Sequence, residues 1–334
     1  MHPLQDTAIA AGEQELLGRA ASYCEQISLK ELTEERLLGL AKEQGSDFAT
    51  AVAYQSVCRD PAHAQAIARL ERLLSTTEAA PRVDGRASFG LIPNLGYFLD
   101  NRPQRAGSLM FDVAKSFGFD TFIVPTPHTG NLQANARLIC DTLSHRADDR
   151  IVLVSISKGS SDLKIAFDEP SAGEAFRKVV AWINICGLLD GTAVVNLLLD
   201  HRDAETEAQI LGWFRGRGED YVHLLIDALH DCGRGPDRPL GGALNVPPDI
   251  RQYHIAAFPL ERHIEFEHMK FLNQVLLQLG PNDGYALLAD LLNKPGVILP
   301  FWGSDHYVYQ AVDLPRIVAG LLRLICEDCH LASP

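Results

Sequence analysis

The sequence has no excess of positive charge and no long apolar run. Its 30 Lys and Arg against 43 Asp and Glu give a formal net charge of -13. Such an acidic surface disfavours nucleic acid and anionic membranes as partners, because both are negatively charged. No stretch stays apolar over the roughly 20 residues of a membrane-spanning helix, and Met1–Asp6 does not begin a basic segment followed by an apolar one. We therefore expect no nucleic-acid partner, no membrane span and a cytoplasmic location.

Cysteine is sparse and shows no framework of pairs. The 7 cysteines are scattered and odd in number, which is typical of reduced thiols in a cytosolic protein. Cys326 and Cys329 have C-x-x-C spacing, which also occurs in redox and metal pairs, but no second pair exists to complete a zinc site. We interpret them as free thiols at a helix end, and we expect no metal and no organic cofactor.

What the sequence does contain is a change of periodicity along the chain. Apolar residues recur at helical spacing through residues 1–80, which predicts an N-terminal helical module. This module could cover the main domain, form a homodimer surface or pack against a sheet. From residue 86 to 330, short apolar runs alternate with helical patterns, which predicts a buried parallel sheet between helices. Ligands bind beyond the carboxyl ends of the strands of such a sheet.

Residues 187–250 interrupt this alternation. They begin with a loop, continue with helical patterns over 205–214 and 221–230, and end in a stretch rich in Gly and Pro. An insertion of this kind after a central strand predicts a lid or a pocket wall.

The stretch Ile151–Asp162 combines an apolar strand, a tight turn and a helical segment. Ser157 lies at the tip of the turn, with Ser155 two residues before it and Gly159 two residues after it. A sharp turn between a strand and a helix requires small residues at those two positions, and this is how a nucleophile elbow is built. We expect Ser157 to be the nucleophile and Ser160–Asp162 to cap the helix that follows.

A serine nucleophile needs a base, and the base needs an acid to orient it. His306 follows the last predicted strand, and Asp283 lies in an Asn-Asp-Gly turn before that strand, so the chain order is Ser, Asp, His. We predict the triad Ser157, His306 and Asp283. Asp190, at the end of an earlier strand, remains an alternative acid, whereas Asp305 is adjacent to His306 and is poorly placed to face its ring.

The predicted oxyanion hole and substrate pocket lie on loops at the same sheet edge. We expect one oxyanion N–H from Lys158, which follows the nucleophile, and one from Leu95, with Asn94 as the next choice. Asn94, His128 and Trp302 follow the ends of predicted strands, and we expect them to line the pocket. A purely structural role for His128 stays open.

Over roughly residues 86–330 these pieces resemble the α/β-hydrolase fold. The resemblance is carried by four stretches: Ser155–Gly159, Ala181–Thr192, Asn282–Gly284 and the loop with His306. The part from Asn184 to Thr192 is similar to the loop after the elbow helix in bacterial lipase-like members, whereas Ser155 stands where the family usually has glycine.

The resemblance implies a mostly parallel central sheet flanked by helices. It also implies a cytosolic serine hydrolase that cleaves a small-molecule acyl ester or thioester through an acyl-enzyme. The same fold hosts acyltransferases and non-catalytic binding proteins. An acyltransferase would result if the pocket excluded water and admitted an acceptor, and a binding protein could use the helical module as its interaction surface.

Overall fold

The structure is a computed structural model that describes residues 9–76, 79–94, 106–127, 130–199, 228–308 and 312–332. Within these ranges, six strands form one sheet in the order β2-β1-β3-β4-β5-β6. The strands are β1 (Ala87–Ile92), β2 (Asp120–Ile123), β3 (Arg150–Ile156), β4 (Val179–Ile185), β5 (Arg251–Phe258) and β6 (Val297–Trp302).

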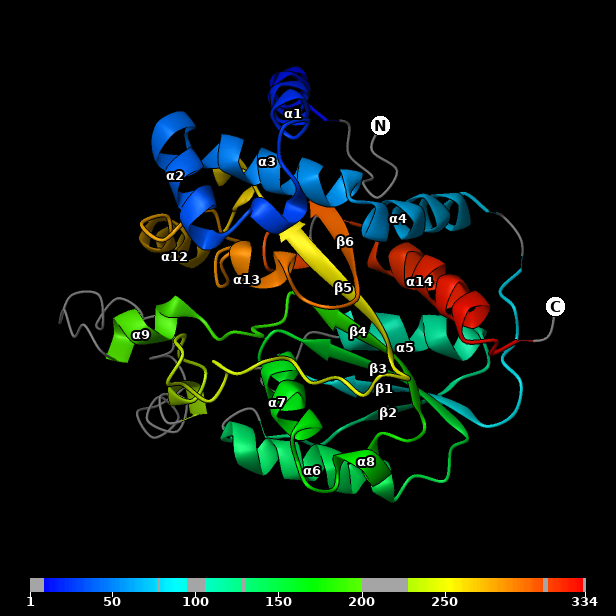
Figure 1. The fold of residues 1–334 in the computed structure, drawn as a ribbon. Coiled ribbons are helices and arrows are strands. Elements are labelled where there is room, and N and C mark those ends of the chain that lie inside the picture. Colours follow the sequence, from blue (N-terminus) through cyan, green and yellow to red (C-terminus); the bar gives the residue numbers. More distant parts are fainter. Residues whose placement is uncertain are drawn as a thin grey trace.

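Helices precede, separate and follow these strands (Figure 1). The described helices are α1 (Ala11–Tyr23), η1 (Leu29–Glu31), α2 (Glu34–Gln44), α3 (Ser46–Arg59), α4 (Pro61–Leu74), α5 (Ala106–Ser116), α6 (Leu132–Ser144), α7 (Lys158–Phe167), α8 (Ala172–Ala175), α9 (Ala193–Leu199), η4 (Glu261–His263), α12 (Glu267–Leu276), α13 (Ala289–Leu292) and α14 (Leu314–Asp328). None of the described helices combines the length and the apolar character needed to cross a bilayer.

Every neighbouring pair of strands in the sheet is parallel, so all six carboxyl ends lie at one edge. The predicted strand Ile151–Val154 lies inside β3, between β1 and β4. Its residues are buried on both faces, which explains the continuous apolar run. The predicted α/β class with a parallel sheet is therefore confirmed.

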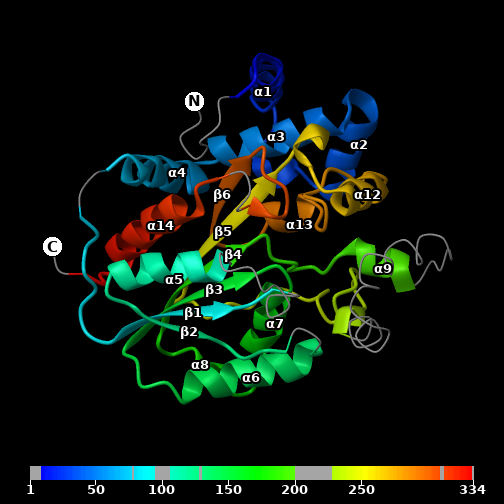
Figure 2. The ribbon, with the colours of Figure 1, turned by 180° about the vertical axis from the view of Figure 1, so that it is seen from behind.

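Side chains alternate across the sheet and divide the core into layers. From β3, Val152 and Val154 pack in a cluster with α5 and α14, whereas Ile151 and Leu153 pack in a cluster with α6, α7 and α8. Figure 2 shows the first layer, with α5 and α14 in front of the strands.

The N-terminal helices cover the part of the second face that α6–α8 leave open. Phe258 of β5 and Ile298 of β6 pack in one cluster with Leu17 of α1, Leu37 of α2 and Tyr54 of α3. Of the three roles considered from the sequence, packing against the sheet is the one these contacts show. The helices contribute to the core of the strands, because β5 and β6 would otherwise expose apolar side chains on this face.

Helix α4 lies along the edge strand β6. The imidazole of His63 accepts a hydrogen bond from the backbone N–H of Ile298 at 3.3 Å. An edge strand with free N–H groups is a template for unwanted pairing, so this contact protects the end of the sheet.

The described parts of the 187–250 segment are residues 187–199 and 228–250. The first contains α9, which the sequence analysis did not predict. The predicted helix over 205–214 lies outside the described residues, as does most of the one over 221–230. A lid is thus not established by these residues.

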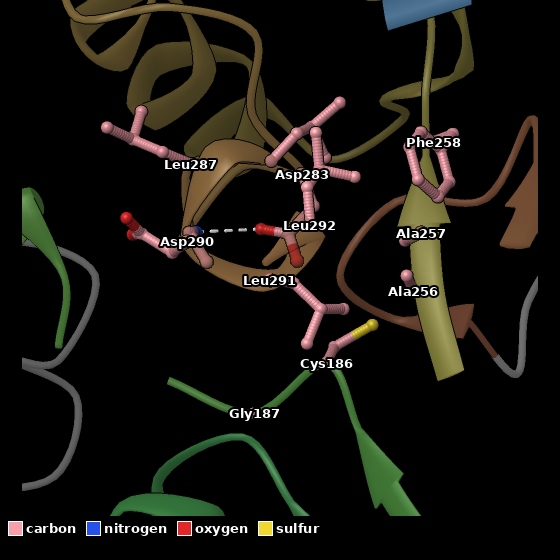
Figure 3. Close-up of a pocket in the computed structure, with 12 residues that line it drawn as sticks. Cys186, Gly187, Ala256, Ala257, Phe258, Asp283, Leu287, Asp290, Leu291 and Leu292 are labelled. Atoms are coloured by element: carbon pink, nitrogen blue, oxygen red, sulfur yellow. Dashed lines mark hydrogen bonds between the residues drawn. The ribbon is translucent and has the colours of Figure 1, made fainter. Parts of the chain in front are cut away.

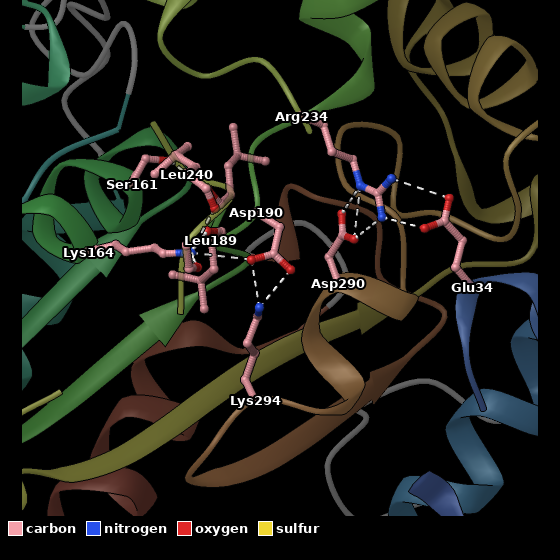
Figure 4. Close-up of polar contacts among 11 residues, drawn as sticks. Glu34, Ser161, Lys164, Leu189, Asp190, Arg234, Leu240, Asp290 and Lys294 are labelled. Atoms are coloured by element: carbon pink, nitrogen blue, oxygen red, sulfur yellow. Dashed lines mark hydrogen bonds and ion pairs between the residues drawn. The ribbon is translucent and has the colours of Figure 1, made fainter. Parts of the chain in front are cut away.

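Two cationic side chains anchor the described parts of this segment (Figure 4). The Lys164 ammonium, on α7, is buried and donates to the carbonyls of Leu189, Leu240 and Gly242 at 2.7, 2.8 and 2.8 Å. Arg234 bridges Asp290 of α13 and Glu34 of α2, with contacts of 2.7 and 2.6 Å. The beginning and the end of the segment are therefore held against the elbow helix, and Arg234 ties it to the N-terminal helices.

Candidate active site

Ser157 occupies the turn between β3 and α7, at the carboxyl edge of the sheet. Its backbone has φ 51° and ψ −119°, a conformation that residues with a side chain rarely adopt. Strain of this kind costs about 1–3 kcal/mol and persists where the surrounding structure enforces it. The Ser157 carbonyl is held by the backbone N–H groups of Ser160 and Leu188. The predicted strand, turn and helix around this serine are therefore present.

The prediction that Ser160–Asp162 cap the helix is wrong. Helix α7 begins at Lys158, directly after the strained serine, so the three residues lie inside the helix and are buried. Ser160 Oγ donates to Asn184 Oδ1, and Ser161 Oγ donates to the Leu188 carbonyl, both at 2.7 Å. Their side chains join the helix to the strand and loop beside it.

The two small residues flanking Ser157 have different neighbours. A Cβ atom on Gly159 would lie 2.6 Å from the Pro93 carbonyl oxygen and 2.7 Å from that of Ile92, so only glycine fits. Ser155 is fully buried, and its Oγ bonds to Ser160 Oγ at 2.7 Å and accepts the indole N–H of Trp182 at 2.8 Å. Serine is accommodated in place of the usual glycine because its hydroxyl is fully partnered.

Gly159→Ala is expected to lower the free energy of unfolding by about 1–3 kcal/mol, because the added methyl meets two backbone oxygens that cannot rotate away. Gly173→Ala in α8 is the matched control, since nothing lies within 4 Å of its Cβ position. Urea denaturation of both variants measures the difference. Equal stabilities would contradict the close packing of β1 against the elbow.

The structure brings Ser157, His306 and Asp283 together. His306 Nε2 lies 2.9 Å from Ser157 Oγ, and His306 Nδ1 lies 2.9 Å from Asp283 Oδ2. Asp283 Oδ1 also accepts the backbone N–H groups of Tyr285 and Ala286 at 2.9 and 2.8 Å. Both Asp283 and His306 are buried. The carboxylate is thus fixed by its own turn and faces the imidazole, which in turn reaches the serine.

The other two carboxylates near the site have other partners. Both oxygens of Asp190 lie 2.6 Å from Lys294 Nζ, and one lies 3.3 Å from Lys164 Nζ (Figure 4). Asp305 accepts the backbone N–H of Tyr307 at 2.8 Å, and burial raises the pKa of its carboxyl to about 6. Asp283 is therefore the carboxylate that contacts His306, whereas Asp190 neutralises two lysines.

The predicted oxyanion residues are only partly within the described ranges. Lys158 is the first residue of α7 and follows Ser157, but Leu95 lies outside the described residues, as does His128. Asn94 is described and half-buried, and it lies just after the end of β1. The carbonyls of Pro93 and Ile92 approach Gly159, so the segment that leads to Leu95 passes beside the elbow.

The Lys158 side chain belongs to a buried polar cluster that sequence reasoning missed. Its ammonium donates to Asp162 Oδ1 at 2.8 Å and to the Gly130 carbonyl at 3.0 Å. Asn135 donates to Asp162 Oδ2 at 3.1 Å and to the Pro127 carbonyl at 3.1 Å. Burial raises the pKa of the Asp162 carboxyl to about 6, although Lys158 acts in the opposite direction. The i, i+4 spacing of the two charges was the available signal.

Trp302 is not brought to this site. The alternation along β6 directs its ring to the face that the N-terminal helices cover, and it is 2% exposed. The ring packs against Tyr54 with a centroid distance of 5.1 Å, and its N–H donates to Glu13 Oε2 at 2.8 Å. The structure therefore corrects the expectation that Trp302 lines the substrate pocket.

A small pocket lies beside Asp283, between α13 and the end of β5 (Figure 3). Its wall includes Cys186 and Asp283 together with apolar side chains such as Phe258 and Leu291. Cys186, Asp283 and His306 each offer one ligand atom, and these atoms lie within 4.8 Å of one another. Asp283 and His306 already bind each other, and burial raises the pKa of the Cys186 thiol well above its usual range. Burial therefore disfavours the thiolate form of Cys186.

The parallel sheet order, the strained serine between β3 and α7, and the loops that carry Asp283 and His306 define the α/β-hydrolase fold. The chain is similar to the crystal structure of the metagenomic carboxyl esterase MGS0156, with 18% identity, a TM-score of 0.54 and coverage of 74% of this chain and 78% of that one. This likeness shows the fold.

Two further solved structures resemble the chain less strongly. One is the mature Bacillus licheniformis lipase BlEst2, with 16% identity, a TM-score of 0.46 and coverage of 78% and 95%. The other is alpha/beta hydrolase domain-containing protein 10 from mouse, with 18% identity, a TM-score of 0.42 and coverage of 74% and 92%. No protein-family model and no curated protein sequence matches the chain.

Proposed function

We propose that this protein is a serine hydrolase that cleaves carboxylic esters, thioesters included, through an acyl-enzyme intermediate. The observation that carries the proposal is the His306 ring, which lies 2.9 Å from both Ser157 Oγ and Asp283 Oδ2. The positive φ of Ser157 supports it, because backbone strain is retained where it presents a reactive side chain. The fold is also that of a carboxyl esterase.

In acylation, the Ser157 hydroxyl attacks the acyl carbon while Nε2 of His306 accepts its proton. Asp283 holds the protonated Nδ1, keeps the imidazole in this tautomer and stabilises its charged form. The N–H groups of Lys158 and Leu95 stabilise the oxyanion. His306 then protonates the leaving alcohol or thiol, and a water activated by the same ring hydrolyses the acyl-enzyme.

The proposal also covers the pocket residues, the cofactor requirement and the cellular location. Asn94 and His128 belong to the loops that follow β1 and β2, and we assign them to the wall of the substrate pocket. The reaction requires no metal and no organic cofactor. All seven cysteines are free, which supports action in the reducing environment of the cytoplasm.

The proposal is tested with a fluorophosphonate probe, which reacts with activated serines. We expect one label per chain in the wild type, mapped to Ser157 by mass spectrometry, and none in Ser157→Ala. Ser155→Gly is the matched control: it removes the neighbouring buried serine and restores the residue usual in this fold, so labelling should persist. Labelling of Ser157→Ala, or no labelling of the wild type together with no turnover of an ester panel, would refute the proposal.

A further inference from the structure

Phe266 is the one large apolar side chain that is exposed in the part of the chain the structure describes, at 39%. Its ring stacks on His268 with a centroid distance of 5.5 Å and an interplanar angle of 28°. It also meets the ring of Tyr307 edge-on at 5.9 Å and 89°. A single exposed aromatic residue needs no explanation, but this one is the outer end of a larger cluster.

The cluster continues inward to the proposed base. Tyr307 packs against Tyr285 at 6.3 Å, and Tyr285 packs against the His306 ring at 4.8 Å. Tyr307 also lies 6.2 Å from the His306 ring. We call Phe266, His268, Tyr285 and Tyr307 the aromatic strip. Its members come from the start of α12, from the turn after Asp283 and from the loop that carries His306.

The geometry of the tetrahedral intermediate determines which part of a substrate would contact this strip. In the tetrahedral intermediate, one oxygen must face the N–H of Lys158, and the leaving oxygen must reach His306 Nε2 to receive its proton. The alcohol part of an ester therefore extends on the side of His306. The strip begins at the His306 ring and ends at an exposed ring, so it lies where that alcohol part leaves the site.

The chemistry of the strip matches an aromatic or bulky apolar group. Aromatic rings bind other rings through offset and edge-to-face contacts. The hydroxyls of Tyr285 and Tyr307 lie 3.5 Å apart, and both residues are only partly buried. Part of the surface of these two tyrosines, next to the proposed base, therefore remains accessible.

We propose that the aromatic strip binds the alcohol part of the ester and makes the protein selective for esters of aromatic alcohols. The inference rests on the proposed serine hydrolase function. Within that function, it assigns Phe266 and Tyr307 as specificity-determining residues.

Two pairs of substrates separate the alcohol side from the acyl side. The first pair, 2-phenylethyl acetate and ethyl acetate, shares the acyl group and differs in the alcohol. The second pair, ethyl phenylacetate and ethyl acetate, shares the alcohol and differs in the acyl group. The ratio of kcat/KM within a pair cancels any general change in catalysis. Members of the first pair form the same acyl-enzyme, so their ratio reports acylation alone.

The wild type is expected to prefer 2-phenylethyl acetate. Phe266→Ala and Tyr307→Leu are each expected to lower that preference about three- to tenfold, because each variant loses one aromatic contact with the substrate. The acyl-side ratio should stay unchanged. Lys270→Ala is the matched control, because Lys270 is exposed on the same helix and pairs with Glu267 rather than with the strip.

The outcomes are distinguishable from failure of the proposed function. A wild type that labels with fluorophosphonate and hydrolyses esters, but whose alcohol-side ratio is unchanged in both variants, would overturn the role of the strip and leave the hydrolase intact. A change confined to the acyl-side ratio would also overturn it, because the strip would then bind the acyl group. A wild type without labelling and without turnover refutes both proposals together.

Discussion

Ser157→Ala is expected to lower kcat/KM for ester hydrolysis by a factor of about 10⁴ to 10⁶, and adding His306→Ala should lower it little further. The reason is that the hydroxyl and the imidazole, 2.9 Å apart, act as one unit: without the nucleophile there is no proton for the base to accept. The measurement is steady-state kinetics on the single variants and the double variant. Multiplicative losses would show that the two residues act independently and would contradict the triad.

The two acids considered from the sequence provide a matched pair for the same assay. Asp283→Asn is expected to lower kcat about 10⁴-fold, because an amide no longer stabilises the required tautomer and charge of the imidazole. Asp190→Asn disturbs the contacts with Lys294 and Lys164 instead, so the folded variant should retain most of its kcat. The reverse ranking would make Asp190 the functional acid.

Lys158→Met is expected to lower the free energy of unfolding by about 3–5 kcal/mol near neutral pH, because it leaves the Asp162 carboxylate buried without its ammonium partner. Asn135 still donates to this carboxylate, but an amide does not compensate its charge. Denaturant titration of the wild type and the variant gives this difference.

The stability lost in Lys158→Met should depend on pH, and the pKa of Asp162 determines whether the loss grows or shrinks as pH rises. Burial raises this pKa from 3.8 to about 6 in the folded protein, so the folded state binds the proton more tightly than the unfolded state. The stability contributed by that proton is present below the unfolded pKa and is lost as pH rises through the folded one. Removing the Lys158 ammonium raises the folded pKa further. The variant should therefore lose more stability at about pH 8 than at about pH 5.

A double variant supplies the control for this prediction. Lys158→Met combined with Asp162→Asn removes both charges, and it should recover much of the stability lost in the single variant and show little dependence on pH over this range. If Lys158→Met alone is as stable as the wild type at about pH 8, the pair does not stabilise the elbow helix as argued.

Much of the site follows from local sequence. The apolar run of β3, the small residues around Ser157 and the change to helical periodicity specify a strand–turn–helix, because each depends only on neighbours in the chain. The positions of Asp283 and His306 before and after the last strand also follow, since parallel strands bring the loops at their carboxyl ends to one edge. The three residues that lie together at this edge, Ser157, Asp283 and His306, could therefore be predicted as a set.

Where several sequence positions satisfied the same pattern, tertiary contacts decided between them. Asp190 and Asp283 both follow elements at the correct edge, and the ammonium groups of Lys294 and Lys164 occupy the first while His306 meets the second. Trp302 ends the strand that leads to His306. Side chains alternate between the two faces of β6, however, and the Trp302 ring lies on the face that the N-terminal helices cover, against Tyr54.

The sequence by itself determined the parallel α/β sheet, the turn that presents Ser157 and the chain order of the three triad candidates, because these depend on periodicity and on residue size. The tertiary structure alone decided that α7 begins at Lys158, that the N-terminal helices cover β5 and β6, and that a strip of rings extends from His306 to Phe266. These features are contacts between residues far apart in the chain, and periodicity carries no information about which distant side chains meet.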